Sequence, residues 1–179
     1  MLTSVFVGTS LDGFIARLDG SFDFLDAAGN IPHGYDEFIA TVDCLVIGRK
    51  TFEIILGFPD WPYGNRQVIV LSSHPIDLSP VRAHHVEHNV EQMSGSPGEI
   101  CTNLAARGLK HAYVDGGITV QRFLSAGMVQ RITISRVPVL IGQGIPLFGS
   151  LPHDIHLRHI ATRTYPTGLV KTEYEILPK

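Results

Sequence analysis

The sequence predicts a single α/β domain of three layers, with a mixed sheet that ends in an antiparallel hairpin. Short apolar runs alternate along most of the chain with segments whose apolar residues recur at helical spacing. The last two runs instead alternate apolar with polar residues and are joined by Pro-Thr-Gly, as in a half-exposed hairpin. The length of 179 residues suits one domain.

The first half of the chain alternates strand and helix signals. Residues 5–8 predict a buried strand, and a polar loop punctuated by glycine follows it. Apolar residues at i, i+3, i+4 and i+7 over 35–42 predict a helix with one face in the core. A strand is predicted at 45–47, then a helix over 52–56 that stops at the next glycine, and a second buried strand at 67–71.

The second half repeats this order and then changes. Residues 85–88 have the pattern of a short strand, and 97–108 that of a helix with proline near its start. A strand, two glycines and a helix follow over 111–127, and an apolar run predicts a strand within 129–140. The closing hairpin is predicted within 154–177.

Composition excludes several classes of function. The net charge of −3 leaves no basic footprint for nucleic acid. The N-terminal segment has the pattern of neither a signal peptide nor a membrane span. Cys44 and Cys101 form no CxxC pattern, which is typical of buried thiols in a reducing compartment. We therefore expect a cytoplasmic protein that binds neither nucleic acid nor membrane.

The stretch CLVIGRKTFE joins a buried strand to a helix whose first turn is basic. Free N–H groups and the helix dipole favour anions at this end, so Arg49 and Lys50 are unexpected there. A bound phosphate would explain them, and Gly48 would let backbone amides approach it. The alternative is a plain helix start with both cations in solvent.

A second junction has the same form. Gly116 and Gly117 follow a predicted strand, and Thr119 lies near the start of the next helix, as Thr51 does in the first junction. In open α/β sheets, ligands bind beyond the carboxyl ends of strands, at helix N-termini. Two such junctions in one small domain favour a bound dinucleotide.

The segment LSSH at 71–74 ends the strand after the first junction. Its two serines and His74, together with the two cations, could surround an extra phosphate on a ribose, which would favour NADP(H) over NAD(H). Ser-Ser-His-Pro as turn chemistry is the alternative.

Familiar catalytic and metal motifs do not fit. The segment 142–149 begins as G-x-G, but a leucine stands where the dinucleotide fingerprint needs its third glycine, so we predict a turn. Histidines cluster within 84–88 and 153–159, yet neither group has HExxH spacing. The second group lies on an alternating strand, where residues i and i+3 point to opposite faces. We expect no metal site.

Taken in order, SLDGFIA, IGRKTFE, VLSS and DGGITVQRFL resemble the dihydrofolate reductase fold. They are more similar still to the reductase domain of the riboflavin-biosynthesis deaminase–reductases and their stand-alone relatives. VLIGQGIPLFG before the closing hairpin is similar to that second branch. The resemblance runs from about residue 2 to the C-terminus and implies a three-layer α/β/α fold with a mixed, mostly parallel eight-stranded sheet.

The resemblance also implies NADPH as cofactor and a homodimer. Gly48 to Thr51 would meet the pyrophosphate and the ribose phosphate, and the glycine pair, often joined by a cis peptide in this fold, would close on the cofactor. The residues that would bind NADPH are Val7, Gly8, Asp12, Ile15, Ala16, Gly48, Arg49, Lys50, Thr51, Leu71, Ser72, Ser73, Asp115, Gly116, Gly117, Ile118 and Thr119.

The implied chemistry is hydride transfer to a C=N or C=O bond of a small pyrimidine- or pterin-like substrate, as in 5-amino-6-(5-phosphoribosylamino)uracil reductase. Dihydrofolate reductases place an acid on the first helix, but here Pro32 and His33 stand at the matching offset. Asp36 is the predicted proton donor, with His33 or a water as alternatives. Asp36 could equally be a first-turn charge favoured by the helix dipole.

Two further alternatives stay open at this stage. The first concerns three aromatic residues, which either line the substrate pocket or belong to the core: Phe22, Phe24 and Trp61. The protein could also be a dihydrofolate reductase with a relocated acid, or a non-catalytic sensor that keeps the NADP cradle.

Overall fold

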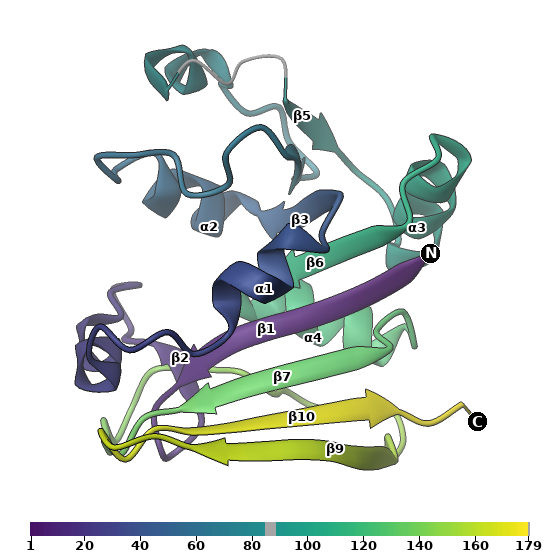
Figure 1. The fold of residues 1–179 in the computed structure, drawn as a ribbon. Helices are drawn as coiled ribbons and strands as arrows, with labels where there is room; N and C mark the ends of the chain where they lie inside the picture. The colour runs from purple at the N-terminus through teal and green to yellow at the C-terminus, as the bar shows by residue number, and fades with distance from the viewer. Residues whose placement is uncertain (85–88, 179) are drawn as a thin grey trace.

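The computed structural model describes residues 1–84 and 89–178, so the strand predicted at 85–88 lies outside the described residues. The described chain forms one eight-stranded mixed sheet with helices on both faces (Figure 1). The order of strands is β5-β4-β3-β6-β1-β7-β10-β9. Their bounds, in that order, are Val90–Met93, Gln67–Leu71, Cys44–Gly48, His111–Asp115, Leu2–Thr9, Arg131–Arg136, Val170–Ile176 and Leu157–Thr164.

The sheet is parallel from β5 to β7 and becomes antiparallel at its end. Strand β1 pairs in parallel with β6 and β7, whereas β10 is antiparallel to both β7 and β9. The last two strands are the predicted hairpin, and they lie along one edge of the molecule in Figure 1. The predicted three-layer mixed sheet is therefore confirmed.

Two helices pack on each face of the sheet. Helices α1 (Tyr35–Ala40) and α2 (Arg49–Ile55) cover one face, where Phe52 and Ile55 join the side chains of β3 and β4 in a buried cluster. Helices α3 (Pro97–Ala106) and α4 (Gly117–Ser125) cover the other face, in a cluster that includes residues of β1, β6 and β7. Burial of these apolar faces is the dominant stabilising term, at roughly 25 cal/mol per Å².

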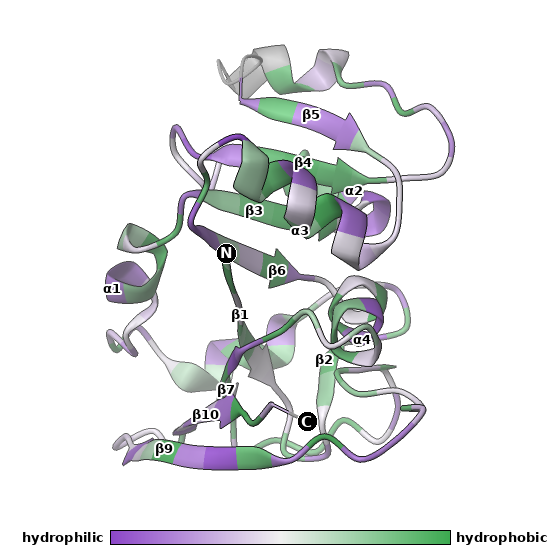
Figure 2. Cartoon of the chain, turned by 90° about the vertical axis from the view of Figure 1, so that its right-hand side faces the viewer, coloured by the Kyte–Doolittle hydropathy of each residue, from purple (hydrophilic) through white to green (hydrophobic). Residues whose placement is uncertain are grey.

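Burial follows the hydropathy of the strands. Residues Leu45, Val46 and Ile47 of β3 are fully buried, because helices cover both faces of a parallel strand. Strand β9, at the edge, is exposed along almost its whole length and carries polar side chains (Figure 2).

Short elements escaped the sequence prediction. Strand β2 (Phe14–Ala16) pairs with β8 (Ile145–Pro146) in a separate two-stranded sheet, and η1 (Asp23–Ala28) and η2 (Ser79–His84) are 3₁₀ helices. Strands β2 and β8 have only three and two residues, too few to show a periodicity in the sequence. The β2–β8 ladder nonetheless needs Gly144, where a Cβ atom would lie 2.4 Å from the carbonyl oxygen of Ala16.

No helix among residues 1–84 and 89–178 is long and apolar enough to cross a membrane. Both cysteines are free thiols, Cys44 buried and Cys101 partly buried.

Candidate active site

A cavity of about 480 Å³ opens beyond the carboxyl ends of β1 and β6, between these strands, α2 and the loop after β2. We call it the apolar cavity, because aliphatic and aromatic side chains make up most of its wall. The predicted residues that line it are Val7, Gly8, Ile15, Ala16, Thr51, Asp115 and Gly116. The remaining predicted cofactor residues lie outside this lining, and they are Asp12, Gly48, Arg49, Lys50, Leu71, Ser72, Ser73, Gly117, Ile118 and Thr119.

The two glycine junctions lie side by side at the rim of the apolar cavity. Strands β3 and β6 are neighbours in the sheet, which brings the start of α2 next to the start of α4. A Cβ atom on Gly48 would lie 2.8 Å from the Oγ1 atom of Thr119, and one on Gly116 would lie 2.4 Å from that of Thr51. Each threonine hydroxyl thus packs on the glycine of the other junction, and any larger residue would displace it.

The backbone at Gly116 has a positive φ of 92°, which side chains rarely adopt. The cis peptide expected at the glycine pair is wrong for this structure, because no peptide bond among the described residues is cis. Two helix starts, two hydroxyls and bare glycine backbone suit the phosphates of a dinucleotide.

The cations of the first junction are accessible. The Nε atom of Arg49 lies 3.2 Å from the Oε1 atom of Glu53 one turn later, and both side chains are about half exposed. Lys50 is exposed as well. The alternative of a plain helix start with both cations in solvent thus describes this structure. A surface ion pair of this kind contributes little to stability, so Arg49 could exchange Glu53 for a phosphate.

The serines after β4 take part in a local turn. Leu71 pairs with Gly48 across the sheet, so this turn adjoins the first junction. The Ser72 hydroxyl donates to the His74 carbonyl at 2.7 Å and accepts from the His74 N–H at 3.2 Å. The Ser73 hydroxyl lies 3.1 Å from the His74 ring. The alternative of a local turn therefore describes this segment. The two serines, of which Ser73 is exposed, also adjoin the predicted phosphate site.

Asp12 ties two loops together beside the apolar cavity. Its carboxylate accepts from the N–H groups of Ile141 and Gly142, the latter at 2.8 Å. A hydrogen bond with Ser10 is the main cause that lowers the pKa of Asp12, and these backbone donors add to it. The geometry agrees with the predicted role of ordering the loop between β1 and β2.

Asp115 is the acid that reaches the apolar cavity. It ends β6, partly buried near Tyr35, Tyr63 and Tyr113, and accepts the Gly116 N–H at 2.7 Å. Burial raises the pKa of Asp115 to about 6, against 3.8 for an ordinary aspartate. A carboxyl of this pKa is partly protonated near neutrality and can donate a proton.

Asp36 and His33 are placed differently. Asp36 is exposed in the first turn of α1, and it is not among the residues that line the apolar cavity. His33 does line the cavity, with its Nδ1 atom 3.2 Å from the carbonyl oxygen of Ile31. Proton donation by Asp36 remains a prediction, but the geometry favours Asp115.

The aromatic residues divide between cavity and core. Phe22 lines the apolar cavity, where its ring packs edge-on against Phe58 at 6.1 Å. Phe24 is buried in a core cluster, and Trp61 packs edge-on against Tyr63, itself a wall residue. Trp61 is thus separated from the apolar cavity by the side chain of Tyr63.

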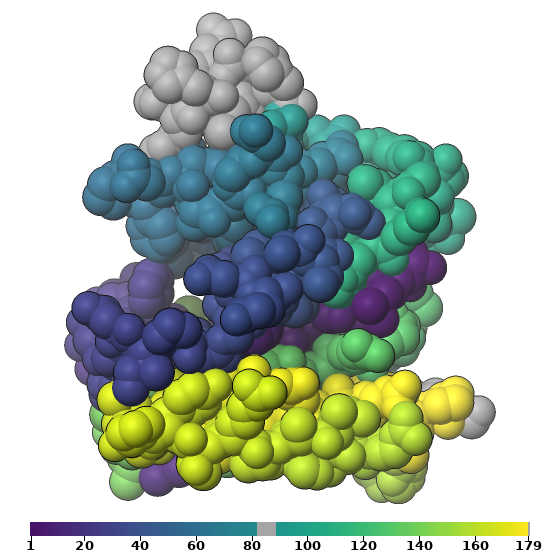
Figure 3. Space-filling model, viewed as in Figure 1, coloured from purple at the N-terminus to yellow at the C-terminus, as the bar shows by residue number. Residues whose placement is uncertain are grey.

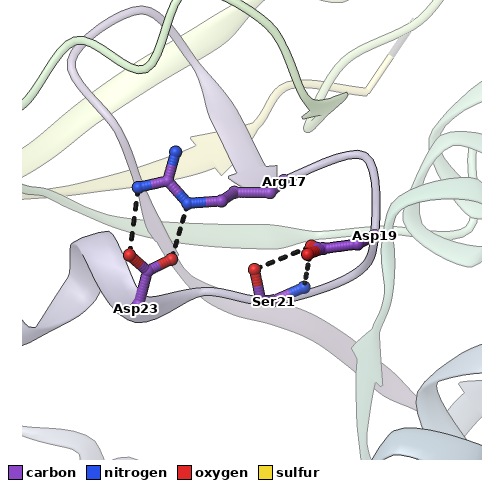
Figure 4. A network of polar contacts seen from close by, with 4 residues as sticks. All are labelled: Arg17, Asp19, Ser21 and Asp23. Atoms are coloured by element: carbon purple, nitrogen blue, oxygen red, sulfur yellow. Dashed lines mark hydrogen bonds and ion pairs between the residues drawn. The ribbon is translucent and has the colours of Figure 1, made fainter.

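Polar contacts hold the loop that carries Phe22. The Arg17 guanidinium donates to both carboxylate oxygens of Asp23, at 2.6 and 3.0 Å (Figure 4). Asp19 accepts from the N–H and the hydroxyl of Ser21, at 2.9 and 2.7 Å. These bonds fix the turn in which the chain passes from β2 to η1.

Ser135 belongs to the wall of the apolar cavity, although no sequence pattern predicts it there. Ser135 is 3% exposed and its hydroxyl has no hydrogen-bond partner among the described residues, although it lines the apolar cavity. Its place on β7, directly opposite Gly8 of β1, is set by the register of the sheet. A serine within the run ITISR gives no hint of this, whereas an unpaired buried hydroxyl in a cavity suits a ligand.

The strand order and the placement of the helices define a fold class, the dihydrofolate reductase-like fold. Residues 3–171 match the model of the RibD C-terminal domain. The chain belongs to that family.

Three solved structures resemble the chain. A putative riboflavin biosynthesis protein from Shewanella sp. PV-4 is 34% identical, with a TM-score of 0.90 over 99% of this chain and all of the other. A diaminohydroxyphosphoribosylaminopyrimidine deaminase/5-amino-6-(5-phosphoribosylamino)uracil reductase from Thermotoga maritima is 11% identical, with a TM-score of 0.73 over 98% of this chain and 56% of the other.

The third is the dihydrofolate reductase of Enterococcus faecalis, solved in a complex with NADP(H). It is 17% identical, with a TM-score of 0.66 over 98% of this chain and 96% of the other. The predicted fold is confirmed by these likenesses, and the family supports an oxidoreductase.

Proposed function

We propose that the protein is an NADPH-dependent reductase that adds a hydride to a C=N or C=O bond of a small pyrimidine- or pterin-like heterocycle. The observation that carries this proposal is a partly buried acid, Asp115, in an apolar cavity whose rim holds two adjacent glycine junctions. Membership of the RibD C-terminal domain family supports it.

The residues at the junctions fit the cofactor. Gly48 and Gly116 leave room for backbone amides to meet a pyrophosphate, and the Thr51 and Thr119 hydroxyls lie beside them. Arg49 is accessible for a phosphate on the adenosine ribose. When bound, NADPH supplies the hydride, while the protein orients the substrate and excludes water.

The proton is assigned to Asp115. Reduction of a C=N bond needs one hydride on carbon and one proton on nitrogen. The protonated Asp115 carboxyl would donate that proton, and burial raises its pKa to about 6, so that a fraction of the carboxyl is neutral near neutral pH. The unpaired Ser135 hydroxyl is available to bind a polar edge of the heterocycle.

Fluorescence titration with NADPH, NADH and FMN tests the cofactor assignment. Trp61 lies one residue behind the cavity wall, so energy transfer to a reduced nicotinamide would quench its emission. We expect NADPH to bind most tightly. If none of the three binds, the proposal fails.

Isotope-labelled NADPH offered with pyrimidine and pterin substrates tests catalysis. Label in a pyrimidine product supports the proposal, and label in dihydrofolate alone would indicate a dihydrofolate reductase with a relocated acid. Binding without transfer to any substrate would indicate a non-catalytic sensor.

We also propose a cytoplasmic homodimer. The apolar segment VPVLIG, where Leu140 is 69% exposed, is one surface that a second copy would cover. Light scattering at micromolar concentration should give twice the mass of the chain, 19.6 kDa. A monomer across that range would contradict this part.

A further inference from the structure

A second cavity, of about 770 Å³, lies on the same sheet face as the apolar cavity. We call it the polar cavity. Its floor is formed by β1, β7, β10 and β9. Parts of β1 and β7 are visible at the surface between α1 and the closing hairpin, which β10 and β9 form (Figure 3). Its volume is in the range of small-molecule sites.

One segment separates the two cavities. Pro32 and Gly34 line the polar cavity, whereas His33 and Tyr35 line the apolar one. Phe6 lies beneath this segment and contributes to both walls. The polar cavity is therefore a separate space that shares a partition with the proposed reductase site.

The register of the strands gathers charge on the floor of the polar cavity. Lys171 of β10 lies directly opposite Arg163 of β9, and Glu173 lies opposite Thr133 of β7. Cross-strand partners share a face, so these side chains form one continuous polar surface. Among the helices of the described chain, α1 is the one that contributes residues to the lining of this cavity.

Lys171 is a buried cation in the wall. It is 6% exposed, and its Nζ atom lies 3.0 Å from the Oε1 atom of Glu173. A Cβ atom on Gly34 would lie only 2.8 Å from that Nζ atom, so the ammonium group packs directly against the partition. Within the described part of the chain, Glu173 accepts one of the three N–H donors of the Lys171 ammonium group. Two donors are left for a ligand.

Two guanidinium groups add to this positive charge. Arg163 and Arg131 both line the polar cavity, and neither has an ion pair within residues 1–84 and 89–178. Glu37, on the α1 wall, is the one carboxylate of the lining besides Glu173. The lining holds three cationic side chains and two carboxylates. Because Lys171 and Glu173 form a pair, the two arginines outnumber the one remaining carboxylate, and this excess favours an anion on the hairpin side.

We propose that the polar cavity binds a small molecule through a doubly negative group, a phosphate or a dicarboxylate, held by Lys171 and Arg163. The bidentate geometry of arginine suits both kinds of anion. The buried Lys171, which pairs with Glu173 through one of its three donors, supplies the second contact.

Thermal unfolding of the full chain in increasing inorganic phosphate tests the site, with chloride used to hold ionic strength constant. A ligand that binds the native state raises the melting temperature. Succinate in place of phosphate distinguishes a site for any dianion from one for phosphate.

Three variants locate the binding. Arg163→Gln should need about ten- to a hundredfold more phosphate for the same rise, because a charged hydrogen bond is lost. Arg158→Gln is the matched control, since Arg158 lies on the same strand, pairs with Glu175 and is outside the cavity. Arg49→Gln should keep most of the rise, because Arg49 belongs to the proposed cofactor junction and does not line the polar cavity.

The inference is overturned if the wild type shows no rise with either anion. It is also overturned if Arg163→Gln responds like the wild type, or if Arg49→Gln alone removes the response. Lys171→Met should weaken phosphate binding similarly. If that variant does not fold, the exposed Arg163 still decides the outcome. Cofactor titration is a separate readout, so failure of the reductase proposal leaves this test intact.

Discussion

Replacing Asp115 by asparagine removes the proposed proton and keeps the shape of the side chain. The amide oxygen can still accept the Gly116 N–H that the carboxylate accepts at 2.7 Å. We therefore expect NADPH binding to survive and turnover to fall. General acids typically contribute about 10²- to 10⁴-fold, and that is the expected loss.

The free energy of unfolding of Asp115→Asn should rise, whereas its turnover falls. The pKa of Asp115 is about 6 in the folded protein and 3.8 is its ordinary value, so the native state binds more protons between these values. Stability conferred on the wild type by the neutral carboxyl is lost as pH rises from about 4 to about 6. At about 1.4 kcal/mol per pKa unit, Asp115→Asn should stabilise the protein by up to about 3 kcal/mol above pH 6.

Urea unfolding at about pH 7.5 and at about pH 4 measures this difference. The gain should be present at the higher pH and small at the lower, where Asp115 is protonated in the folded protein and about half protonated in the unfolded chain. Asp60→Asn, at an exposed aspartate, is the matched control and should show no such pattern. The wild-type turnover should fall as pH rises through about 6.

Two results would refute this reasoning. If Asp115→Asn were no more stable than the wild type at about pH 7.5, the carboxyl would not be destabilised by its surroundings. If Asp36→Asn lost turnover while Asp115→Asn kept it, the acid on α1 that the sequence predicted would be the donor.

The remaining predictions concern the junctions and the loop. Gly116→Ala should abolish NADPH binding, because its Cβ atom would meet the Thr51 hydroxyl at 2.4 Å; Gly108→Ala, with φ of 87° and nothing within 4 Å, controls for backbone strain alone. Arg49→Ala should weaken NADPH binding about ten- to a hundredfold in titrations and leave NADH binding unchanged; equal losses would refute the ribose-phosphate role. Asp12→Ala should loosen the loops it joins, seen as faster amide hydrogen exchange at residues 141 and 142, and unchanged exchange would contradict this role.

Most of the sheet could be predicted because its signals are local. The runs at 45–47 and 67–71 are apolar throughout, as strands buried on both faces must be, and the hairpin alternates as a half-exposed one must. The helix over 97–106 begins with a capping box, in which Ser96 and Glu99 exchange hydrogen bonds.

Parts of the candidate site could not be predicted because they depend on register. Nothing near Ser135 in the sequence indicates a cavity, and it reaches one only because β7 pairs with β1. Asp115 likewise lies near Tyr35 and Tyr63, which come from segments distant in the sequence. Asp36 was predicted from its place on the first helix, and a position in the sequence carries no information on burial.

The central position of β1 has a consequence for how the protein is made. Its partners, β6 and β7, are the strands that leave the ribosome long after it, with β3, β4 and β5 emerging in between. Strands β3, β4 and β5 can pair in the order in which they are synthesised, whereas Val5 and Val7 have no sheet to join until β6 arrives. Such long-range pairing slows folding and leaves apolar surface open to aggregation. Nascent chains that stall before residue 111 should therefore be the forms that depend most on chaperones.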